Sequence, residues 1–465
     1  MTERRPLRIA IVGSGPAGLY AAGHLLSGPH GTYLHGEVVD LHDEQIEVDV
    51  YERLPTPWGL VRGGVAPDHA EKKLVSTVFN AIAARKGFRF FGNVELGSDV
   101  HHDELAAWYD GVIYAVGAAG DNRMGIDGEE LPGSHSAREF VSWYNGHPDQ
   151  AEMQFDLSAE RAVVIGNGNV ALDIARILTL PDDELRRTDI ADHALEVLRH
   201  SSIREVIVLG RRGLNQAAFN NPELEGLGEL KDVDIAVEGV DLGSATTTDV
   251  DVRKLTTIRS YLERPRTGAG KRIVLHFMAS PIQIHGTTRV DSVTIARNEL
   301  IAGPDGSLRA RSTTDTTTLP AGLVLRAVGY RGAPVAGLPF DQHTGTIPNE
   351  GGRVVGSPGV YVTGWIKRGP SGIIGTNKKC ARDTVRALLE DHRTGNLPTA
   401  DTLSSAQVTA ELARRQVAVV TDEQWKAIDR HERRAGAYFG RPRIKLTSRS
   451  ALLDRANSAS AAGER

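Results

Sequence analysis

The clearest chemical signal in the chain is a pair of glycine-rich turns, each between an apolar run and a helix-like segment. The first turn, Gly13–Gly18, reads GSGPAG and follows the apolar run Arg8–Val12. In this strand–turn–helix setting Gly13 permits the tight turn, Gly15 lets the backbone approach a pyrophosphate, and Gly18 lets helix and strand pack closely. The N-terminus of the following helix offers free N–H groups to the phosphates. A glycine turn without a ligand is the alternative, but the setting favours a dinucleotide.

The second turn lies within Arg161–Ala175, RAVVIGNGNVALDIA. Gly166, Gly168 and Ala171 occupy the spacing G-x-G-x-x-A, again after an apolar run and before a helix-like segment. Two such units in one chain indicate two dinucleotide sites.

The strand that follows the first turn ends in an acid. We predict a strand over Ile46–Glu52, and the carboxylate of Glu52 can accept hydrogen bonds from an adenosine ribose. Glu52 follows Gly18 by 34 residues (52 − 18) rather than about 20, and the polar stretch 28–45 accounts for the difference. An exposed carboxylate at a strand end is the alternative.

The strand that follows the second turn ends in two bases. Arg211 and Arg212 come directly after the strand predicted at Glu205–Leu209 and Gly210. Guanidinium groups bind a 2′-phosphate through charge-assisted, often bidentate, hydrogen bonds, whereas a carboxylate would repel it. The first unit therefore suits FAD and the second NADP(H), with a solvated basic turn as the alternative for the arginines.

An α/β fold is needed to position these turns. The chain has 465 residues, 40% of them hydrophobic, and 50 glycines, which suits two or three domains. Strands closing on glycine at Gly111–Gly117 and Leu323–Gly329 indicate where the chain crosses between domains. We expect an FAD-binding domain over 1–119, an NADP(H)-binding domain over 120–330, and the second part of the FAD-binding domain with a C-terminal extension over 331–465.

Further elements are predicted between these landmarks. They are a rigid loop without helix or strand at Leu54–His69, a helix over Glu71–Lys86, strands at Phe88–Phe91 and Asn93–Leu96, a polar insertion at Pro181–Ser202, a strand, turn and helix at Gly359–Ala387, and a short, frayed helical end at Thr447–Arg465.

Composition excludes several classes of function. A formal charge of −5 gives neither a nucleic-acid footprint nor a polybasic membrane tail. One cysteine, Cys380, excludes an intramolecular disulfide, a Cys-x-x-Cys redox centre and an iron–sulfur cluster ligated by the chain. No run is long enough to span a bilayer and no secretory signal stands at the start, so we expect a cytoplasmic protein.

Longer motifs resemble one family of flavoproteins. The C-terminal turn reads Thr363-Gly364-Trp365, where the wider group of flavoproteins with two dinucleotide-binding domains commonly has T-G-D. Together with PTPWGLVRGGVAPDH, GNGNVALD, GRRG and GWIKRGPSGIIGTNKK, it resembles the adrenodoxin reductase-like NADPH–ferredoxin reductases from Ile9 to about Leu446. The resemblance implies two Rossmann-like domains, for FAD and NADP, on the glutathione-reductase-like plan.

The resemblance also implies binding roles. FAD would be held by Gly13, Gly15, Ala17, Gly18, Glu52, Leu60, Val94, Trp365, Gly372, Ile373 and Ile374. NADP(H) would be held by Asn167, Gly168, Asn169, Val170, Arg211, Arg212 and Glu223, with Gly372 near the nicotinamide.

Two of the implied residues belong to the catalytic edge, His69 in the APDH loop and Glu223. His69 would be a proton or hydrogen-bond partner near the flavin, with a structural loop histidine as the alternative. The family pattern usually has a second acid three residues after Glu223, where this chain has Gly226. Glu225 or Glu229 could substitute for it.

The implied activity transfers a hydride from NADPH to flavin N5 and then passes single electrons to a ferredoxin. Because the chain lacks a dithiol and a cluster-ligand set, the acceptor must be external. The resemblance implies an acidic ferredoxin that feeds an acceptor such as a haem monooxygenase, and a reductase that is a monomer or weak dimer. Candidate docking residues are Arg204, Arg253, Lys254, Arg259, Arg264, Arg266, Lys271 and Arg272. The alternatives are an NADPH-oxidising electron-input subunit of a larger enzyme and a nucleotide-binding protein without turnover.

Overall fold

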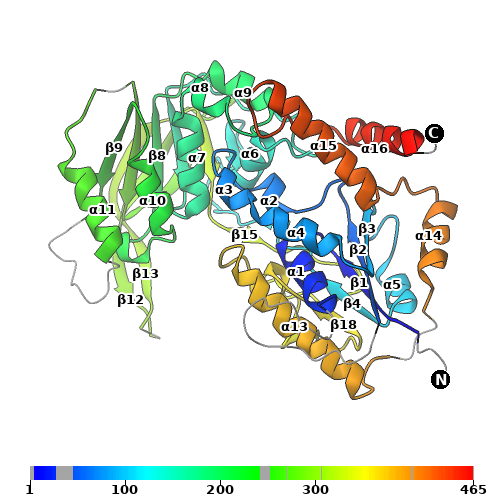
Figure 1. The fold of residues 1–465 in the computed structure, drawn as a ribbon. Helices are drawn as coiled ribbons and strands as arrows, with labels where there is room; N and C mark the ends of the chain where they lie inside the picture. The colour runs from blue at the N-terminus through cyan, green and yellow to red at the C-terminus, as the bar shows by residue number, and fades with distance from the viewer. Residues whose placement is uncertain are drawn as a thin grey trace.

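The computed structural model describes residues 5–27, 45–240, 252–268, 270–304, 306–398 and 402–463. These residues form two layered units that lie side by side (Figure 1). One unit contains both ends of the chain and the other is built from its middle. The polar stretch predicted at 28–45 lies outside the described residues, except for Gln45.

The first unit is built on a seven-stranded sheet. Its strands are Leu7–Val12 (β1), Ile46–Glu52 (β2), Phe88–Gly92 (β3), Gly111–Tyr114 (β4), Asn349–Glu350 (β16), Arg353–Val354 (β17) and Val360–Val362 (β18). They lie in the order β16-β17-β18-β4-β1-β2-β3. β18, β4, β1, β2 and β3 run parallel, and β16 and β17 add an antiparallel edge. β1 is buried along its whole length, as expected of a parallel strand covered on both faces.

Helices cover both faces of this sheet. One face is packed by Pro16–Leu25 (α1), Val75–Ala83 (α4), Thr376–Arg393 (α13), Asp422–Tyr438 (α15) and Arg449–Gly463 (α16). The other face is packed by His102–Trp108 (α5), Trp365–Arg368 (α12) and Ser405–Arg414 (α14). Alternate residues of β1 serve the two layers, since Ile9 and Ile11 face the first core and Ala10 and Val12 face the second.

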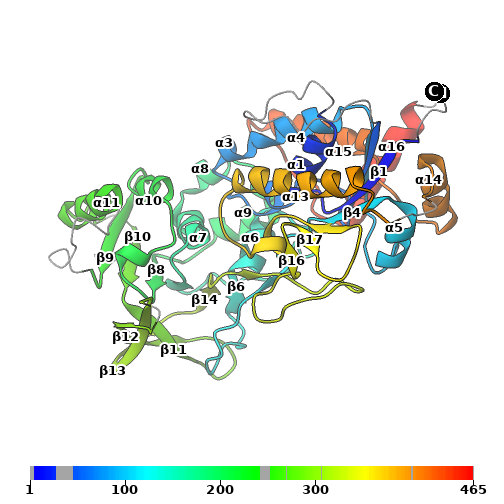
Figure 2. The same cartoon turned by 90° about the horizontal axis from the view of Figure 1, so that it is seen from below.

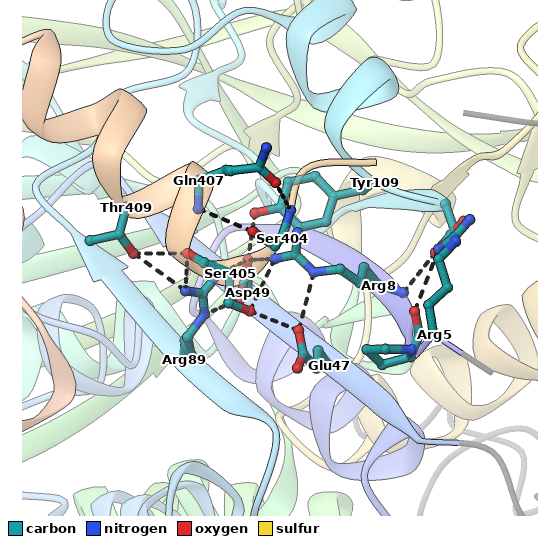
Figure 3. A network of polar contacts seen from close by, with 12 residues as sticks. Arg5, Arg8, Glu47, Asp49, Arg89, Tyr109, Ser404, Ser405, Gln407 and Thr409 are labelled. Carbon is teal, nitrogen blue, oxygen red and sulfur yellow. Dashed lines mark hydrogen bonds and ion pairs between the residues drawn. The ribbon is translucent and has the colours of Figure 1, made fainter. Parts of the chain in front are cut away.

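A buried polar network ties the strands of this unit to α14 (Figure 3). Asp49 of β2 accepts hydrogen bonds from Arg8 at 3.0 Å, from Arg89 at 2.5 and 2.7 Å, and from the Tyr109 hydroxyl at 2.5 Å. Arg89 also donates to the backbone oxygen of Ser405 at 2.7 Å. The carboxylate is thus enclosed by donors, which is the condition under which a buried charge is tolerated.

The second unit is built on a six-stranded parallel sheet. Its strands are Ser134–Ser136 (β6), Arg161–Ile165 (β7), Glu205–Gly210 (β8), Val233–Glu238 (β9), Lys271–Phe277 (β10) and Leu323–Arg326 (β14). The order is β6-β14-β7-β8-β10-β9. One face packs against Ala137–Tyr144 (α6), Asn169–Thr179 (α7), Asp182–Leu185 (α8), Asp192–Arg199 (α9), Leu214–Gln216 (η1), Asn221–Leu227 (α10) and Val252–Glu263 (α11).

The other face of this sheet is covered by a second, smaller sheet rather than by helices. Ala279–His285 (β11), Ser292–Ala302 (β12) and Leu308–Pro320 (β13) form an antiparallel three-stranded sheet (Figure 2). Its apolar residues share one core with the inner face of the six-stranded sheet.

The two passages of the chain between the units lie next to each other. Gly120–Asp121 (β5) pairs antiparallel with Tyr330–Arg331 (β15). The domain boundaries predicted at 119/120 and 330/331 fall at this ladder, and as boundaries they stay a prediction.

The units are also joined by residues 440–446, which we call the C-terminal strap. Its Arg441 lies 2.5 Å from Asp192 of α9, and its Lys445 lies 3.3 Å from Asp189 in the loop before α9. Both basic side chains are buried. The strap therefore anchors the end of the first unit in the second.

Several sequence predictions are corrected. The loop Leu54–His69 is not wholly irregular, because Leu60–Gly63 (α2) forms one helical turn. The helix predicted over Glu71–Lys86 is divided at Leu74 into Ala70–Lys73 (α3) and α4. Asn93–Leu96 is not a strand, because Asn93 has a φ of +59° and its N–H bonds back to the oxygen of Leu54.

The predicted lengths of other segments also change. The insertion Pro181–Ser202 contains α8 and α9, and the last residues form the 15-residue helix α16 rather than a short one. The strands at Gly111–Gly117 and Leu323–Gly329 end at Tyr114 and Arg326.

Candidate functional site

The first glycine turn is closed so tightly that side chains do not fit. Gly13 has a φ of +104°, and a Cβ there would lie 2.5 Å from the oxygen of Ala115. A Cβ on Gly18 would lie 1.9 Å from the oxygen of Gly13. The helix α1 begins at Pro16 without a side-chain cap, so its first N–H groups remain available. This is a cradle for a pyrophosphate at the carboxyl end of β1.

Glu52 lies beside this cradle and retains acceptor capacity. Its Oε2 accepts from the Ser14 backbone N–H at 3.1 Å and from the Ser14 hydroxyl at 2.6 Å, and its Oε1 accepts from the Leu54 N–H at 3.1 Å. A carboxylate offers about four lone-pair sites, so a ribose hydroxyl can still donate to it. These local hydrogen bonds fix the orientation of the carboxylate beside the turn.

The C-terminal turn packs directly on α1. Gly364 has a φ of +75°, and a Cβ there would lie 2.6 Å from the Cβ of Ala17. The ring of Trp365 lies against Tyr330, with centroids 5.4 Å apart. The buried Nε1 of Trp365 has no hydrogen-bond partner among the described residues, which fits an N–H that awaits a ligand acceptor.

The apolar residues assigned to the flavin differ in exposure. Leu60 is 39% exposed and Ile373 61% exposed, whereas Ile374 is half-buried. Side chains as exposed as the first two can be covered by an apolar ligand. Val94 is buried in the core around β1, so its side chain is not available, and only its backbone lies near Glu52.

Gly372 stands where the chain enters α13. It has a φ of +83°, and a Cβ there would lie 2.6 Å from the hydroxyl of Thr376. The Thr376 hydroxyl accepts from the N–H of Ile373 at 3.2 Å, so the turn is closed by its own side chain. Gly375 and Thr376, where α13 begins, are exposed.

The second glycine turn has the same construction as the first. Gly166 has a φ of +121°, and a Cβ there would lie 2.2 Å from the oxygen of Ala327. Gly168 precedes α7, which has no side-chain cap at its N-terminus. The Asn169 side chain accepts from the N–H of Asn220 at 2.8 Å, while Val170 is half-buried against the core.

The second turn lies beside the arginine pair. A Cβ on Gly210 would lie 2.5 Å from the amide nitrogen of Asn167, so Gly210 lets the two turns meet. Arg211 is exposed and Arg212 half-buried. Neither guanidinium forms an ion pair with a described residue. Two positive charges therefore stand free beside the α7 N-terminus.

His69 lies where the two units meet. Its Nδ1 is 3.0 Å from Glu71, and its buried Nε2 is 3.2 Å from Asp173 of α7 without a well-directed hydrogen bond. Arg176 contacts Asp173 at 2.8 Å and also pairs with Asp68. Burial alone would raise the pKa of Asp173, but contacts with His69 and Arg176 bring it below its ordinary value. The APDH loop is thus bound to the NADP-side unit by charge.

Glu223 also contacts the first unit. Its buried carboxylate lies 2.7 Å from the ammonium of Lys72 on α3. Glu225, one of two candidates to replace the missing acid at Gly226, instead pairs with Arg253 of α11. Glu229 is exposed, and nothing lies within 4 Å of a Cβ on Gly226.

Sequence reasoning missed three of these residues, which are Asp173, Tyr330 and Lys72. Asp173 lies one helical turn beyond Asn169, on the helix that starts at the second glycine turn, and this spacing could have indicated it. Tyr330 directly follows the glycine at the second crossing. Lys72 carries no local signal.

The comparisons with known proteins agree with this geometry. A family model described as pyridine nucleotide-disulphide oxidoreductase matches residues 7–207. NADPH-ferredoxin reductase FprA of Mycobacterium tuberculosis (strain ATCC 25618 / H37Rv) is 49% identical over 461 residues, which cover 97% of this chain and 99% of that protein. The chain belongs to the NADPH-ferredoxin reductase family. A second relative, the mitochondrial NADPH:adrenodoxin oxidoreductase of Arabidopsis thaliana, is 40% identical over 475 residues, which cover 97% of this chain and 95% of the relative.

A solved structure of an NADPH-ferredoxin reductase supports the fold. M. tuberculosis FprA in complex with NADPH has a TM-score of 0.91 and 48% identity, covering 97% of this chain and all of that one. The resemblance inferred from the motifs, the α/β fold and the oxidoreductase class with FAD and NADP(H) are thereby confirmed. Within the described residues, no helix combines the length and apolar character needed to cross a bilayer.

The cysteine content separates the chain from the disulphide chemistry in the name of the matched family model. Cys380 is the single cysteine of the sequence. Its buried Sγ accepts from the N–H of Gly364 at 3.3 Å, so it supports the C-terminal turn. With a single cysteine, the chain cannot form the dithiol that such disulphide chemistry requires.

Proposed function

We propose that this chain takes a hydride from NADPH onto a bound FAD and delivers electrons one at a time to a ferredoxin. The observation that carries the proposal is the contrast between the two nucleotide turns. Glu52 stands beside the first, and Arg211 and Arg212, free of ion pairs with described residues, stand beside the second. A ribose without a phosphate fits the first and a 2′-phosphate fits the second.

The residues of the first unit fit FAD. Gly13 permits the tight turn and Gly18 the close packing of α1 on β1, Gly15 would let the backbone approach the pyrophosphate, and Glu52 would accept from the ribose. Leu60, Ile373 and Ile374 supply apolar cover, the backbone of Val94 adds a contact, and Trp365 offers its unpartnered N–H. These assignments rest on the cradle and on the orphaned indole nitrogen.

The residues of the second unit fit NADP(H). At the uncapped start of α7, the N–H groups at Gly168–Val170 would hold the pyrophosphate, and the arginine pair would hold the 2′-phosphate. Glu223 and Gly372 are assigned to the nicotinamide end. When bound, FAD supplies an N5 hydride acceptor that can later release its electrons singly.

His69 and Asp173 are the groups that can hold a proton at the boundary. His69 Nε2 and Asp173 Oδ1 are 3.2 Å apart, and both side chains are largely shielded from water. The orientation of the His69 ring is set by two carboxylates, Glu71 at Nδ1 and Asp173 at Nε2.

The structure bears on where an acidic ferredoxin could dock. Arg204, Lys271 and Arg272 lie at the amino ends of β8 and β10, whereas the arginine turn follows the carboxyl end of β8. The six residues of β8 span about 20 Å. A partner bound at that edge would be a strand length away from the nucleotide turns.

Other candidates are engaged within the second unit. Arg253 pairs with Glu225, Lys254 donates to the oxygen of Ala217 at 3.1 Å, and Arg264 donates to the oxygen of Gly228 at 3.1 Å. Arg259 and Arg266 are exposed. These contacts compete with docking at α11.

A basic surface at the start of α13 fits a ferredoxin better. Lys378 and Lys379 lie in the first turn of α13, which has no acidic residue. A helix N-terminus disfavours cations, so the two lysines add to a positive field that is already present. The exposed Ile373 is adjacent. An acidic partner docked here would sit beside the residues assigned to the flavin.

Purified protein reconstituted with FAD tests the proposal. NADPH should bleach the yellow colour, and the reduced protein should reduce cytochrome c only when a ferredoxin is added. Bleaching without ferredoxin-dependent transfer would favour the electron-input subunit. A preparation that takes up no FAD would contradict both enzymes and favour a nucleotide-binding protein. A cytoplasmic monomer or weak dimer stays a prediction, which size-exclusion chromatography addresses for the oligomeric state.

A further inference from the structure

The backbone of the arginine turn is held from outside the six-stranded sheet. The backbone oxygen of Arg211 accepts a hydrogen bond from Nδ2 of Asn298 at 2.8 Å. The backbone oxygen of Arg212 accepts from the N–H of Met278 at 3.3 Å. Asn298 belongs to β12 of the three-stranded sheet (Figure 2), and Met278 lies at the junction between β10 and β11, so neither anchor belongs to the six-stranded sheet.

The Asn298 amide is buried and fully engaged. Only 3% of the residue is exposed. Its Nδ2 also donates to the hydroxyl of Ser280 at 2.7 Å, and its Oδ1 accepts from the hydroxyl of Ser312 at 3.1 Å. With one hydroxyl on each side, the amide cannot rotate without losing hydrogen bonds.

Two irregularities aim this amide at the turn. The pairing of β12 with β13 shifts register between Ala296 and Asn298, which is the effect of a β-bulge. Met278 has a φ of +56°, and its oxygen accepts from the N–H of Asn298 at 2.6 Å. Bulges and left-handed residues redirect side chains that a regular ladder would place elsewhere.

We propose that Asn298 is a positioning residue for recognition of the nucleotide 2′-phosphate. The peptide that joins Arg211 to Arg212 is pinned at its oxygen by Asn298, and this peptide sets the direction in which both side chains leave the backbone. The inference rests on the proposed function, which assigns the two arginines to that phosphate.

Restraint of the backbone matters here because no ion pair with a described residue holds the guanidinium groups. Neither Arg211 nor Arg212 pairs with a described carboxylate, so no ion pair restricts where they point. A long side chain ordered by a ligand costs conformational entropy on binding, and a fixed backbone lowers that cost. Loss of the anchor should therefore weaken 2′-phosphate binding without altering the rest of the nucleotide site.

Asn298→Leu tests the inference, with Thr294→Val as the matched control. Thr294 lies on the same strand and contacts His285 and Thr318, so its loss disturbs the small sheet but not the arginine turn. The binding probe is adenosine 2′,5′-bisphosphate, titrated by calorimetry against FAD-loaded protein. We expect its Kd to rise about three- to tenfold in Asn298→Leu, the range of one neutral hydrogen bond, and to stay unchanged in Thr294→Val.

Steady-state kinetics supply the second readout. KM for NADPH should rise by the same factor in Asn298→Leu, while kcat and KM for NADH stay at wild-type values. Ser312→Ala frees one end of the amide and keeps the anchor, so it should give a smaller change in the same direction. It also serves as the test variant if Asn298→Leu does not fold.

Unchanged bisphosphate binding in these variants, or an equal loss with NADPH and NADH, would overturn the inference. The Arg211→Ala, Arg212→Ala double variant separates this failure from failure of the proposed function. If the double variant loses NADPH and NADH to the same extent, the phosphate assignment itself is wrong. If the double variant weakens NADPH selectively and the Asn298 variants do not, only the positioning role falls.

Discussion

Lys72 of α3 lies 2.7 Å from Glu223 of α10 and joins the two units beside the nucleotide edge. Glu223 is 8% exposed at its side chain and Lys72 34% exposed. The Glu223 carboxylate is therefore more shielded from water than the Lys72 ammonium. Removing the lysine leaves a buried charge, whereas removing the acid leaves an ammonium that water can reach.

This asymmetry predicts unequal effects on stability. Lys72→Met should lower the free energy of unfolding by about 1–2 kcal/mol, less than for a fully buried pair because the lysine is partly in water. Glu223→Gln should cost less, and the double variant should cost less than the sum of the two. Chemical denaturation of the three proteins measures the coupling, and additive losses would contradict an interaction between them.

The arginine pair predicts coenzyme preference. Replacing Arg211 and Arg212 with Ala should raise KM for NADPH by roughly 10- to 100-fold per arginine, since a charged hydrogen bond contributes about 1.5–3 kcal/mol. KM for NADH should change little. Kinetics with both coenzymes decide the matter, and equal losses would remove the 2′-phosphate assignment.

His69 predicts an effect on reaction rate rather than on FAD binding. His69→Gln retains a polar side chain but cannot carry a positive charge between Glu71 and Asp173. We expect the rate of flavin reduction by NADPH, or its pH dependence, to change while FAD stays bound. Stopped-flow bleaching across a pH series is the measurement. An unaltered profile would leave His69 a structural loop residue.

The strap predicts how stability depends on pH. Burial alone would raise the pKa of Asp189, but Lys445 and Lys73 bring it below its ordinary value. Such a carboxyl stabilises the fold above its unfolded pKa of about 3.9, and the contribution is lost as pH falls toward the folded pKa. Burial lowers the pKa of Lys445, so its charged form is disfavoured in the fold and stability rises with pH toward about 10.4.

Lys445→Met tests this pH dependence. The variant should lower the free energy of unfolding at neutral pH. It should also reduce the loss of stability on acidification, because Asp189 then has only Lys73 as an ion-pair partner. Lys426→Met is the control, since it breaks a partly exposed pair with Asp422 within α15. Thermal unfolding from acid to alkaline pH gives both curves. Parallel curves for Lys445→Met and the wild type would exclude a titrating role for the strap.

The docking surface predicts a charge effect that depends on position. Lys379→Glu should raise KM for ferredoxin several-fold, with a smaller effect at high salt because exposed charges are screened over about 10 Å at 0.1 M ionic strength. Arg204→Glu makes a comparable charge change at the amino end of β8, on the side of the second unit away from the arginine turn. It should have little effect on KM for ferredoxin. The reverse ranking would place docking at the β8 and β10 edge.

Local signals were predictable and distant ones were not. Gly13 and Gly166 could be assigned because their steric requirement is written in adjacent residues, and both have the expected positive φ. Asn93 broke a predicted strand because one left-handed residue outweighs strand-forming neighbours. Lys72 and Glu223 are 151 positions apart, and Asn298 and Arg211 are 87 apart. The first pair is made by the packing of the two units and the second by the packing of two sheets within one unit, so no spacing in the sequence indicates either.

The paired passages at β5 and β15 carry a mechanical consequence when taken with the strap. Two adjacent linkers alone would act as a hinge and let one unit rotate about a single axis. The strap connects the units at a second place, beside α9 (Figure 1). We therefore expect coenzyme exchange to proceed by local motion of the residues around the nucleotide sites, while the relative orientation of the two units stays fixed throughout the reaction cycle.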